Sequence, residues 1–399
     1  MDGPVEAVVI GDSRSALAVA RSLGRRGIPV AVAECSHPTL AGSSRYATRR
    51  FSVPDPFLDP DGLAQALREE AEKHPGAVWI PITDEILAVV DGLREQVPGI
   101  RLPFPPSAVL ELAWDKWKLM EFAALCGLSV PRTVRPPHAR AALEAAQTLG
   151  FPVIVKSSRS KLRTKNGFRE GSTRVIATAK DLTRAWESEH ANIPFPLLQE
   201  HIPGHGEGVF ILAEKGRVAA RFAHRRIREK PPSGGVSVLR ESIPVPAALA
   251  EPVDKLVQAL GWHGACMIEF RMDSRDGRPY LMEINPRFWG SLQLAVDAGL
   301  DFPFLLYQLA LEETIPEPQP YRLGVRSRWW LGDLDHLWIR LRHSAGHPYL
   351  PAKPVSKFHA VLDFLNPFAG RQEVFRWSDM KPAWVELFKY LGFRSRRRA

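Results

Sequence analysis

The sequence predicts an α/β protein made of several packed units. Short apolar runs, which are typical of buried strands, alternate along the chain with segments whose apolar residues recur at helical spacing. The chain has 399 residues, of which 45% are hydrophobic and 24% charged, so its composition is that of a globular protein. At roughly 150 residues a domain, this length leaves room for two or three domains.

The first predicted unit is a βαβ motif. Residues 7–10 and 28–33 are apolar strands, and residues 15–26 between them have helical spacing. A dinucleotide-binding turn has the pattern G-x-G-x-x-G, whereas the turn here contains only Gly11. Glu34 stands where a ribose-binding acid would follow the second strand, but a pyrophosphate could not approach the backbone closely without the second glycine. We therefore expect a Rossmann-like unit that binds no nicotinamide cofactor.

The next elements lead to a helix that begins with lysines. A polar triplet, residues 83–85, follows the apolar strand 78–82. Asp115 is placed to cap a helix over residues 115–126, and Gly127 ends it. The first turn of this helix contains two lysines, Lys116 and Lys118.

From about residue 129 the pattern predicts a second α/β region. Helices are expected over residues 139–149, 182–190 and 251–260. Strands are expected over residues 151–156, 197–202, 209–213, 218–223, 265–270 and 280–284. The last two strands form a hairpin, because the turn-forming segment 273–278 joins them.

Cysteine content and hydropathy predict a soluble protein of the reducing cytoplasm. The three cysteines, Cys35, Cys126 and Cys266, are far apart, so they build neither a disulfide framework nor a structural zinc site. No run of about 18 apolar residues is present, and the N-terminus lacks the basic start and apolar core of a secretion signal.

The excess positive charge of the chain lies in its last 79 residues. Residues 321–399 hold 15 Lys and Arg against 6 Asp and Glu, whereas residues 1–320 hold 38 of each kind. A helix expected over residues 383–391 carries apolar Trp384, Leu387, Phe388 and Leu391 beside the cationic end of the chain. This helix could rest on an anionic membrane surface or contact a polyanion, and the alternative is a helix that docks on the body of the protein.

The predicted hairpin carries the clearest site chemistry. Glu283 and Asn285 are two residues apart and so share one face of their strand. Glu269 lies at nearly the same distance from the turn on the opposite strand, which makes it a cross-strand neighbour at roughly 5 Å. Two carboxylates so close raise each other's pKa unless a cation lies between them. Hard oxygen donors favour Mg²⁺, which completes its shell with water and substrate phosphates, over zinc; the alternative is an exposed acidic hairpin face.

Basic residues elsewhere complement these acids. Lys156 ends an apolar strand, and Lys116 begins a helix, so each could deliver an ammonium group to a cleft. The loop 157–174 holds five basic residues and two glycines, and it is too polar to pack, which indicates either a cover over a triphosphate or a mobile surface loop. No P-loop pattern is present.

A second basic segment, residues 222–237, is the candidate for substrate contacts. Its arginines can pair with a carboxylate in bidentate geometry, and its two glycines permit close backbone approach. The residues are Arg225, Arg226, Arg228, Ser233, Gly234 and Gly235. The alternative is a charged edge strand followed by a turn.

The order of these motifs resembles the ATP-grasp superfamily, and specifically its carboxylate-amine ligase branch, including carbamoyl phosphate synthetase and predicted carboligases. Ile-Glu-Phe at residues 268–270, followed by Met-Glu-Ile-Asn-Pro-Arg at 282–287, is similar to the metal-binding strands of that superfamily. The resemblance covers about residues 5–320. It implies a Rossmann-like pre-ATP-grasp domain over 1–108, a two-subdomain ATP-grasp fold over 109–320 with a nucleotide-covering subdomain over about 129–203, and a basic, aromatic-rich C-terminal extension over 321–399.

The resemblance also implies roles for single residues. Glu269, Glu283 and Asn285 would hold Mg²⁺, or Mn²⁺ in its place, and Arg287 would face the transferred phosphate. Lys116, or Lys118 on the same turn, and Lys156 would contact the phosphates of ATP. The segment containing Gln199, Glu200 and Ile202 would bond adenine through its backbone, and Glu207 would bind ribose. The covering loop contains fewer glycines than in many members of the superfamily. The resemblance therefore does not predict whether this loop closes over the nucleotide.

The implied activity is that of a ligase. A substrate carboxylate would take the γ-phosphoryl group of ATP, and an amine would then displace phosphate, while Arg287 and Arg228 stabilise the oxyanion. Two alternatives remain: an enzyme that phosphorylates bicarbonate or another small molecule without forming an amide, and a nucleotide-binding scaffold whose basic tail binds membrane or polyanion. No nucleic-acid partner is expected, and the substrates and oligomeric state are left open.

Overall fold

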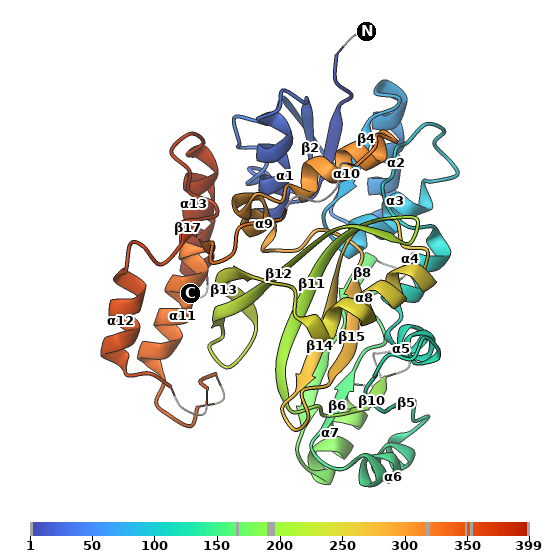
Figure 1. Cartoon of the computed structure of the whole chain (residues 1–399), viewed down its shortest axis with the longest axis vertical. Helices are drawn as coiled ribbons and strands as arrows, with labels where there is room; N and C mark the ends of the chain where they lie inside the picture. The colour runs from blue at the N-terminus through green and yellow to red at the C-terminus, as the bar shows by residue number, and fades with distance from the viewer. Residues whose placement is uncertain are drawn as a thin grey trace.

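The computed structural model describes residues 3–164, 167–189, 196–315, 320–347, 349–351 and 354–396. Figure 1 shows the N-terminal residues at one end of the molecule, a small sheet at the opposite end, and long strands between them. The helices that end the chain lie along one side. Arg397 and Arg398 of the basic tail lie outside the described residues.

The N-terminal unit is a parallel four-stranded sheet covered by helices. Its strand order is β3-β2-β1-β4. The strands are β1 (Ala7–Ile10), β2 (Val30–Glu34), β3 (Arg49–Ser52) and β4 (Val78–Pro81). The helices are α1 (Arg14–Gly24), α2 (Pro60–Lys73) and α3 (Asp84–Gly92). The predicted βαβ motif is therefore present at the start of the chain.

The first turn of this unit packs closely against α3. Gly11 has φ +119°, and a Cβ added there would lie 2.9 Å from Cδ1 of Ile86 on α3. The carboxylate of Glu34, which could have bound a ribose, instead accepts hydrogen bonds from the backbone and side chain of Thr39. His37 also contacts Glu34, at 2.7 Å. The side chain of Glu34 is thus engaged by neighbouring residues of the same unit.

The small sheet lies at the other end of the molecule. Its strand order is β5-β10-β6-β9, and each of its pairings is antiparallel. The strands are β5 (Thr133–Val134), β6 (Val153–Lys156), β9 (Thr173–Ile176) and β10 (Leu197–Glu200). Helices α6 (Ala139–Leu149) and α7 (Ala179–Glu189) pack on one face of it through Ala142, Ala146, Leu182 and Trp186. The other face borders the candidate site.

The central sheet has seven strands in the order β15-β14-β11-β12-β13-β16-β17. The strands are β11 (Gly204–Glu214), β12 (Arg217–Lys230), β13 (Val236–Ile243), β14 (Gly264–Asp273), β15 (Pro279–Asn285), β16 (Arg326–Arg328) and β17 (Arg371–Gln372). Helices α4 (Ser107–Trp114), α5 (Lys116–Leu125) and α8 (Ala247–Ala259) accompany it. The side chains of α5 and α8 form one core with β11, β14 and β15.

Two short helices join the central sheet to the N-terminal unit. Helices α9 (Leu292–Ala298) and α10 (Phe302–Ala310) contact α1. One continuous core includes Val9 of β1, Phe222 of β12, Trp289, and Phe302 of α10. The N-terminal unit is therefore fixed to the central sheet by a shared hydrophobic core rather than by a linker.

The loop expected over residues 157–174 contains a hairpin. Strands β7 (Lys161–Thr164) and β8 (Gly167–Glu170) pair with each other and extend to the N-terminal unit. Phe168 is buried in the core of that unit, and Arg163 forms an ion pair with Asp61. The expectation that this segment is too polar to pack was wrong, because a single aromatic residue anchors it.

The last part of the chain is a helical extension. It contains α11 (Trp330–Arg342), α12 (Lys357–Leu365) and α13 (Lys381–Arg396). Through β16 and β17 it continues the central sheet, and Arg21 of α1 binds Asp379 at 2.8 Å. Helix α13 therefore docks on the body, as the alternative for this segment expects. All three cysteines are unpaired, and none of the described helices is both long and apolar enough to cross a bilayer.

Candidate functional site

A cavity of about 950 Å³ opens between the small sheet and the central sheet. Most of the residues predicted to bind nucleotide, metal or substrate line it, although they come from six strands and one helix. These residues are Lys116, Lys156, Gln199, Glu200, Ile202, Glu207, Arg225, Arg226, Ser233, Gly234, Gly235, Glu269 and Glu283. The fold thus brings the predicted constellation together from segments up to about half the chain apart.

The two predicted carboxylates face each other across β14 and β15. Glu269 and Glu283 are direct partners in the strand register. Ile268 and Phe270 flank Glu269 and are buried under α8, so the alternation along β14 turns Glu269 to the cavity. A register shift follows Glu269, so that Phe270 pairs with Leu281. Because of this bulge, the neighbouring residues Met282 and Glu283 both line the cavity. The regular alternation of side chains along a strand would have placed them on opposite faces.

Basic side chains already contact both acids. Nζ of Lys116 lies 3.2 Å from Oε2 of Glu283, and Arg226 donates to Oε1 of Glu269 at 2.9 Å. Nδ2 of Asn285 donates to Oε1 of Glu283 at 3.1 Å. The three predicted metal ligands are therefore neighbours: Glu269 and Glu283 line the cavity, and Asn285 contacts Glu283 through its amide nitrogen.

The two glutamates differ in their affinity for protons. Desolvation by the surrounding protein, together with the charge of Glu283, raises the pKa of Glu269. Desolvation would also raise the pKa of Glu283, but Lys116, Asn285 and Lys156 outweigh it and lower that pKa. The concentration of negative charge at this point is what a divalent cation neutralises, and oxygen donors of this kind suit Mg²⁺. The residues present therefore fit the metal that the resemblance implies.

Lys116 and Lys156 both lie near Glu283 and close enough to each other for their charges to interact. Asp115 accepts bonds from the backbone amides of Trp117 and Lys118, which starts α5 and sends Lys116 into the cavity. Lys118 is exposed and does not line the cavity, so the geometry favours Lys116 over its alternative. Lys156 is only 4% exposed, and burial together with the charge of Lys116 lowers its pKa to about 7. A bound polyphosphate would restore the charge of this lysine.

The segment expected to bind adenine borders the cavity between the sheets. Gln199 is fully buried and donates to Oγ1 of Thr133 at 2.8 Å, whereas its Oε1 has no partner among the described residues. The carboxylate of Glu200 accepts from Nε of Arg132 at 2.8 Å, and the backbone N–H of Glu200 donates to the carbonyl of Arg132 at 2.9 Å. The carbonyl of Ile202 accepts from Arg271, at 2.6 Å. Glu207 contacts His205 at 2.9 Å.

A second cavity of about 300 Å³ shares Lys116 and Glu283 with the first. It lies under the β7–β8 hairpin, between α3, α4 and the end of β15. Its other charged and polar lining residues are Asp84, Asp91, Glu111, Arg159, Ser160, Lys161, Arg163 and Asn285. A group bound there would reach the acidic centre from the side opposite the first cavity.

Arg287 stands between the second cavity and the N-terminal unit. Its guanidinium lies 3.0 Å from Oδ2 of Asp84 and 3.3 Å from Oδ1 of Asn285. Asp84 is 7% exposed, and its Oδ1 has no partner within the described structure. Sequence reasoning noted the polar triplet that contains Asp84 but gave it no role in the site. The signal was its position directly after an apolar strand, where side chains reach the edge of a parallel sheet.

Arg228 does not lie in this site. Nε and NH2 of its guanidinium donate to the carboxylate of Asp333 on α11, at 2.8 Å and 2.6 Å. It borders a separate cavity lined by residues of the extension. A bulge in the pairing of β12 with β13 occurs at this point and turns Arg228 away from Arg226. Because Asp333 holds the guanidinium away from the carboxylate pair, this geometry does not support the expected role of Arg228 in stabilising an oxyanion.

The other residues of the predicted substrate segment do lie at the first cavity. Arg225 contacts Glu241 at 3.0 Å, and Arg226 bridges Glu229 and Glu269. The turn after β12 holds Ser233, Gly234 and Gly235 at the mouth of the cavity. Of these groups, Arg226 is the one in direct contact with the carboxylate pair.

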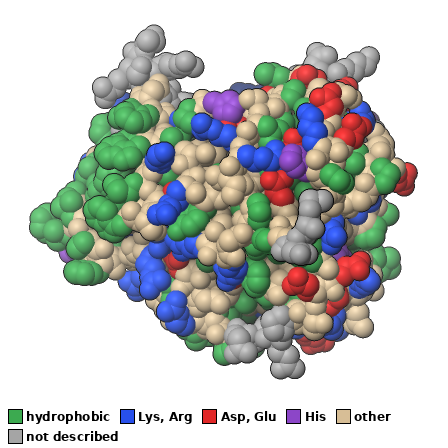
Figure 2. Space-filling view, turned by 90° about the horizontal axis from the view of Figure 1, so that it is seen from above, with side chains coloured by type: hydrophobic (Ala, Val, Ile, Leu, Met, Phe, Trp, Pro, Cys, Tyr) green, Lys and Arg blue, Asp and Glu red, His purple; other side chains and the backbone are tan. Residues whose placement is uncertain are grey.

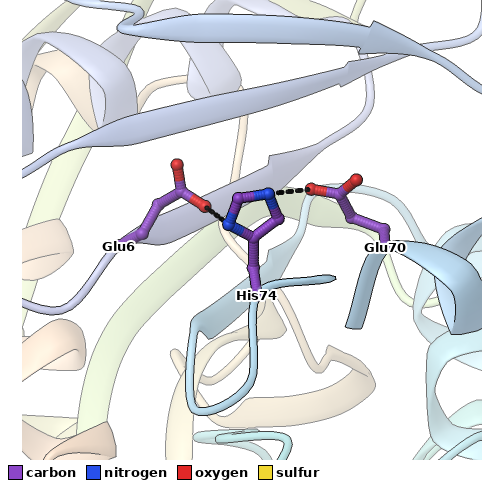
Figure 3. Close-up of side chains that lie close together, drawn as sticks. All are labelled: Glu6, Glu70 and His74. Atoms are coloured by element: carbon purple, nitrogen blue, oxygen red, sulfur yellow. Dashed lines mark ion pairs between the residues drawn. The ribbon is translucent and has the colours of Figure 1, made fainter. Parts of the chain in front are cut away.

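One further group of acids lies in the N-terminal unit. Figure 3 shows His74 between Glu6 and Glu70, at 3.7 Å and 3.8 Å. Arg49 also forms ion pairs with both glutamates. Since an arginine already balances these charges, the group serves to tie β1, α2 and β3 together.

The family described as "ATP-grasp in the biosynthetic pathway with Ter operon" matches residues 192–331. The match includes Glu269, Glu283, Asn285 and Arg287, which are the centre of the site described above. The chain carries an ATP-grasp domain.

Known proteins with this domain extend the likeness to most of the chain. The large chain of carbamoyl phosphate synthase from Methanothermobacter thermautotrophicus is 23% identical over 312 residues, which are 75% of this chain and 28% of that protein. The chain thus spans about a quarter of that relative's length. N5-carboxyaminoimidazole ribonucleotide synthase from Synechococcus elongatus is 27% identical over 203 residues, which are 50% of this chain and 49% of that protein.

Solved structures show the same fold. The biotin carboxylase domain of 2-oxoglutarate carboxylase from Hydrogenobacter thermophilus, in complex with MgADP, ADP and bicarbonate, has a TM-score of 0.65 at 18% identity over 82% of this chain and 74% of that one. An L-amino acid ligase from Bacillus licheniformis has a TM-score of 0.59 at 19% identity over 79% and 76%. The mixed α/β architecture is therefore that of ATP-grasp enzymes.

Proposed function

We propose that this protein is an ATP- and Mg²⁺-dependent ligase that activates a carboxylate as an acyl phosphate and joins it to an amine. The observation that carries the proposal is the register pair of Glu269 and Glu283, with Lys116 and Lys156 beside it, at the junction of two cavities. The larger cavity has the volume and the lining for a nucleotide. The smaller one offers a separate place for the group that receives phosphate.

The roles follow from the charges at the junction. Lys116 and Lys156 would hold the phosphates of ATP, and Glu269, Glu283 and Asn285 would hold Mg²⁺, which neutralises charge on the transferring phosphoryl group. The substrate carboxylate attacks the γ-phosphorus and ADP leaves. The amine then attacks the acyl carbon, phosphate leaves, and the amine loses a proton. Arg287 would stabilise the oxyanion of the second step from its place beside Asn285.

The comparisons support the general chemistry. One similar structure contains MgADP and bicarbonate, and another is named as an L-amino acid ligase. We extend this resemblance by proposing that the N-terminal unit acts as a pre-ATP-grasp domain and supplies Asp84 to the substrate side of the site. Residues 109–320 would form the nucleotide-binding region, and residues 321–399 a basic extension. We further propose that the protein works in the cytoplasm.

The decisive experiment is a screen of carboxylates and amines scored by ADP release, with and without Mg²⁺. We expect Glu283→Gln to reduce ADP release at least a hundredfold while thermal unfolding stays unchanged. Glu251→Gln on the exposed side of α8 is the matched control and should behave as the parent protein does. Near-normal turnover of Glu283→Gln would refute the metal assignment.

Trapping the intermediate separates the ligase from its alternatives. If a carboxylate is activated, hydroxylamine added in place of the amine yields an acyl hydroxamate and one ADP for each hydroxamate. ADP release with bicarbonate alone, without hydroxamate or amide, would instead identify an enzyme that phosphorylates a small molecule. The absence of ADP release with every substrate pair, despite nucleotide binding, would favour a scaffold.

A further inference from the structure

The helices of the C-terminal extension turn apolar stripes to the outside. On α12 the stripe is Phe358, Leu362 and Leu365, and on α13 it is Trp384, Phe388 and Leu391. Both stripes follow the spacing i, i+4, i+7, which places their residues on one side of each helix. Such a stripe ordinarily faces the core of a protein, whereas Trp384 and Phe388 here are 53% and 68% exposed. The opposite side of α13 is the side that packs on the body, through Ala383 and Val385.

Several of these side chains form one continuous surface. Trp330 of α11, Phe375 and Trp384 line an apolar groove of about 370 Å³. Trp377 contacts Phe375 edge to face with ring centroids 4.9 Å apart, and it is 81% exposed. We call Trp330, Phe375, Trp377, Trp384 and Phe388 the aromatic face. Figure 2 shows hydrophobic side chains gathered at the end of the molecule where Figure 1 places the extension, with Lys and Arg side chains at their border.

Most acids of the extension form contacts within the folded structure, and so do several of its bases: Arg326, Arg328, Arg376 and Lys389 form ion pairs, and Arg340 is buried. Its six acidic residues are Asp333, Asp335, Asp363, Glu373, Asp379 and Glu386. All except Asp363 bind partners through their carboxylates within the folded structure. Glu373, for example, binds both Arg14 and Arg240, and Asp379 binds Arg21. The extension holds 15 Lys and Arg against these six acids, so its net charge is positive.

A basic groove adjoins the aromatic face. It has a volume of about 590 Å³, and Trp384 and Phe388 form part of its wall together with Arg45, Arg50 and Lys381. No acidic residue lines this groove within the described part of the chain. Arg50 and Lys381 form no ion pair with any described residue, so their charges are available to an anion.

We propose that the aromatic face and the basic groove bind the surface of an anionic lipid bilayer. Aromatic side chains partition into the headgroup region, where an apolar ring and a polar edge are both accommodated, and lysine and arginine contact lipid phosphates. A second copy of this chain fits less well, because two faces of the same positive charge would be opposed. The protein thus lies on the membrane through its extension, and the proposal does not depend on the reaction at the ATP-grasp site.

The test is sedimentation of the full chain with vesicles. We expect binding to vesicles of three parts phosphatidylcholine and one part phosphatidylglycerol, at least tenfold weaker binding to phosphatidylcholine alone, and loss of binding as salt rises. The double variant Trp384→Ser/Phe388→Ser should lose at least fivefold in affinity, and Arg50→Glu/Lys381→Glu at least tenfold. The matched control is Leu58→Ser/Leu125→Ser, which removes two leucines elsewhere that are even more exposed, at 77% and 88%. All variants should unfold at the temperature of the parent protein.

Three results would overturn the proposal. The first is the absence of binding to anionic vesicles at low salt. The second is an equal loss of binding in the leucine control, which would indicate unspecific adsorption. The third is a stable dimer in analytical ultracentrifugation that Trp384→Ser/Phe388→Ser converts to a monomer, because the face would then be an interface between two copies.

Discussion

The guanidinium of Arg287, directly after the strand that carries Glu283, lies 3.0 Å from the carboxylate of Asp84 in the N-terminal unit. These residues are 203 positions apart in the chain. Burial would lower the pKa of Arg287, but the charge of Asp84 raises it and keeps the guanidinium positive. The N-terminal unit therefore sets the position and the charge of an arginine at the site, although it contributes no residue to the nucleotide cavity.

This contact predicts that Asp84→Asn reduces turnover more than nucleotide affinity. A hydrogen bond to a charged group contributes about 1.5–3 kcal/mol, so kcat should fall roughly 10- to 100-fold while the Kd for ATP changes less than twofold. ADP release with the best substrate pair and calorimetry with a non-hydrolysable ATP analogue measure the two quantities. Asp84→Glu should restore part of the activity, since it keeps the charge.

Asp91→Asn is the control for this variant. Asp91 lies on the same helix and lines the same cavity, but it binds Arg94 instead of Arg287. It should retain the parent kcat. An equal loss of ATP affinity and of kcat in Asp84→Asn would contradict a role that acts through Arg287.

The first turn of α5 offers a sharper test of the phosphate site. Lys116 is buried at the junction of the two cavities, whereas Lys118 is exposed on the same turn. We expect Lys116→Met to weaken binding of a Mg²⁺–ATP analogue at least tenfold, which corresponds to about 1.4 kcal/mol. Lys118→Met should bind as the parent protein does. If the two variants behave alike in calorimetry, the assignment of Lys116 fails.

Local patterns in the sequence predicted the positions of many site residues. The alternation along 265–270, the turn and the alternation along 280–284 were enough to place Glu269 opposite Glu283, because strand register depends on local rules. Asp115 begins its helix as predicted, since capping is also local. The same helix buries Leu119 and Met120 and exposes Leu125.

Contacts between distant segments were beyond local patterns. The residues around Arg228 in the sequence do not indicate that Asp333 is its ion-pair partner. In the same way, the residues around Asp84 do not indicate its pairing with Arg287. The burial of Phe168 could not be predicted either. A single aromatic residue in a basic loop forms no hydrophobic periodicity, and periodicity is the pattern from which burial is predicted. Each of these cases depends on which faces of the units meet, and that is decided by tertiary packing.

The docked hairpin predicts an unusual sensitivity at Gly167. This residue has φ +120°, and a Cβ there would lie 1.9 Å from the backbone oxygen of Phe57. Gly167→Ala should therefore displace β7 and β8 from the N-terminal unit at a cost of about 1–3 kcal/mol. Limited proteolysis should cut within residues 157–174 much faster than in the parent protein. Gly92→Ala, which has open space on α3, is the control, and equal cleavage rates in the two variants would show that the hairpin is not anchored there.

The attachment of the extension depends on a buried ion pair. Arg21 is 2% exposed and donates to the carboxylate of Asp379 at 2.8 Å and to the carbonyls of Glu373 and Val374. The same oxygen of Asp379, Oδ2, also accepts from Oγ of Ser44, and Oδ1 accepts from the amide of Arg45. Breaking such a pair leaves a buried charge without a partner, which costs about 3–5 kcal/mol.

Asp379→Ala should therefore lower the unfolding temperature by several degrees and make the linker before α13 sensitive to protease. Desolvation lowers the pKa of Arg21, and its bonds to Asp379 raise it. Without the carboxylate of Asp379, the buried guanidinium keeps the cost of desolvation and loses the interaction that offsets it. Asp276→Ala, in the exposed turn after β14, should change the unfolding temperature by less than a degree. If Asp379→Ala resembled that control in calorimetry and proteolysis, the extension would be held by its apolar contacts with Leu17 and Leu40 instead of by this pair.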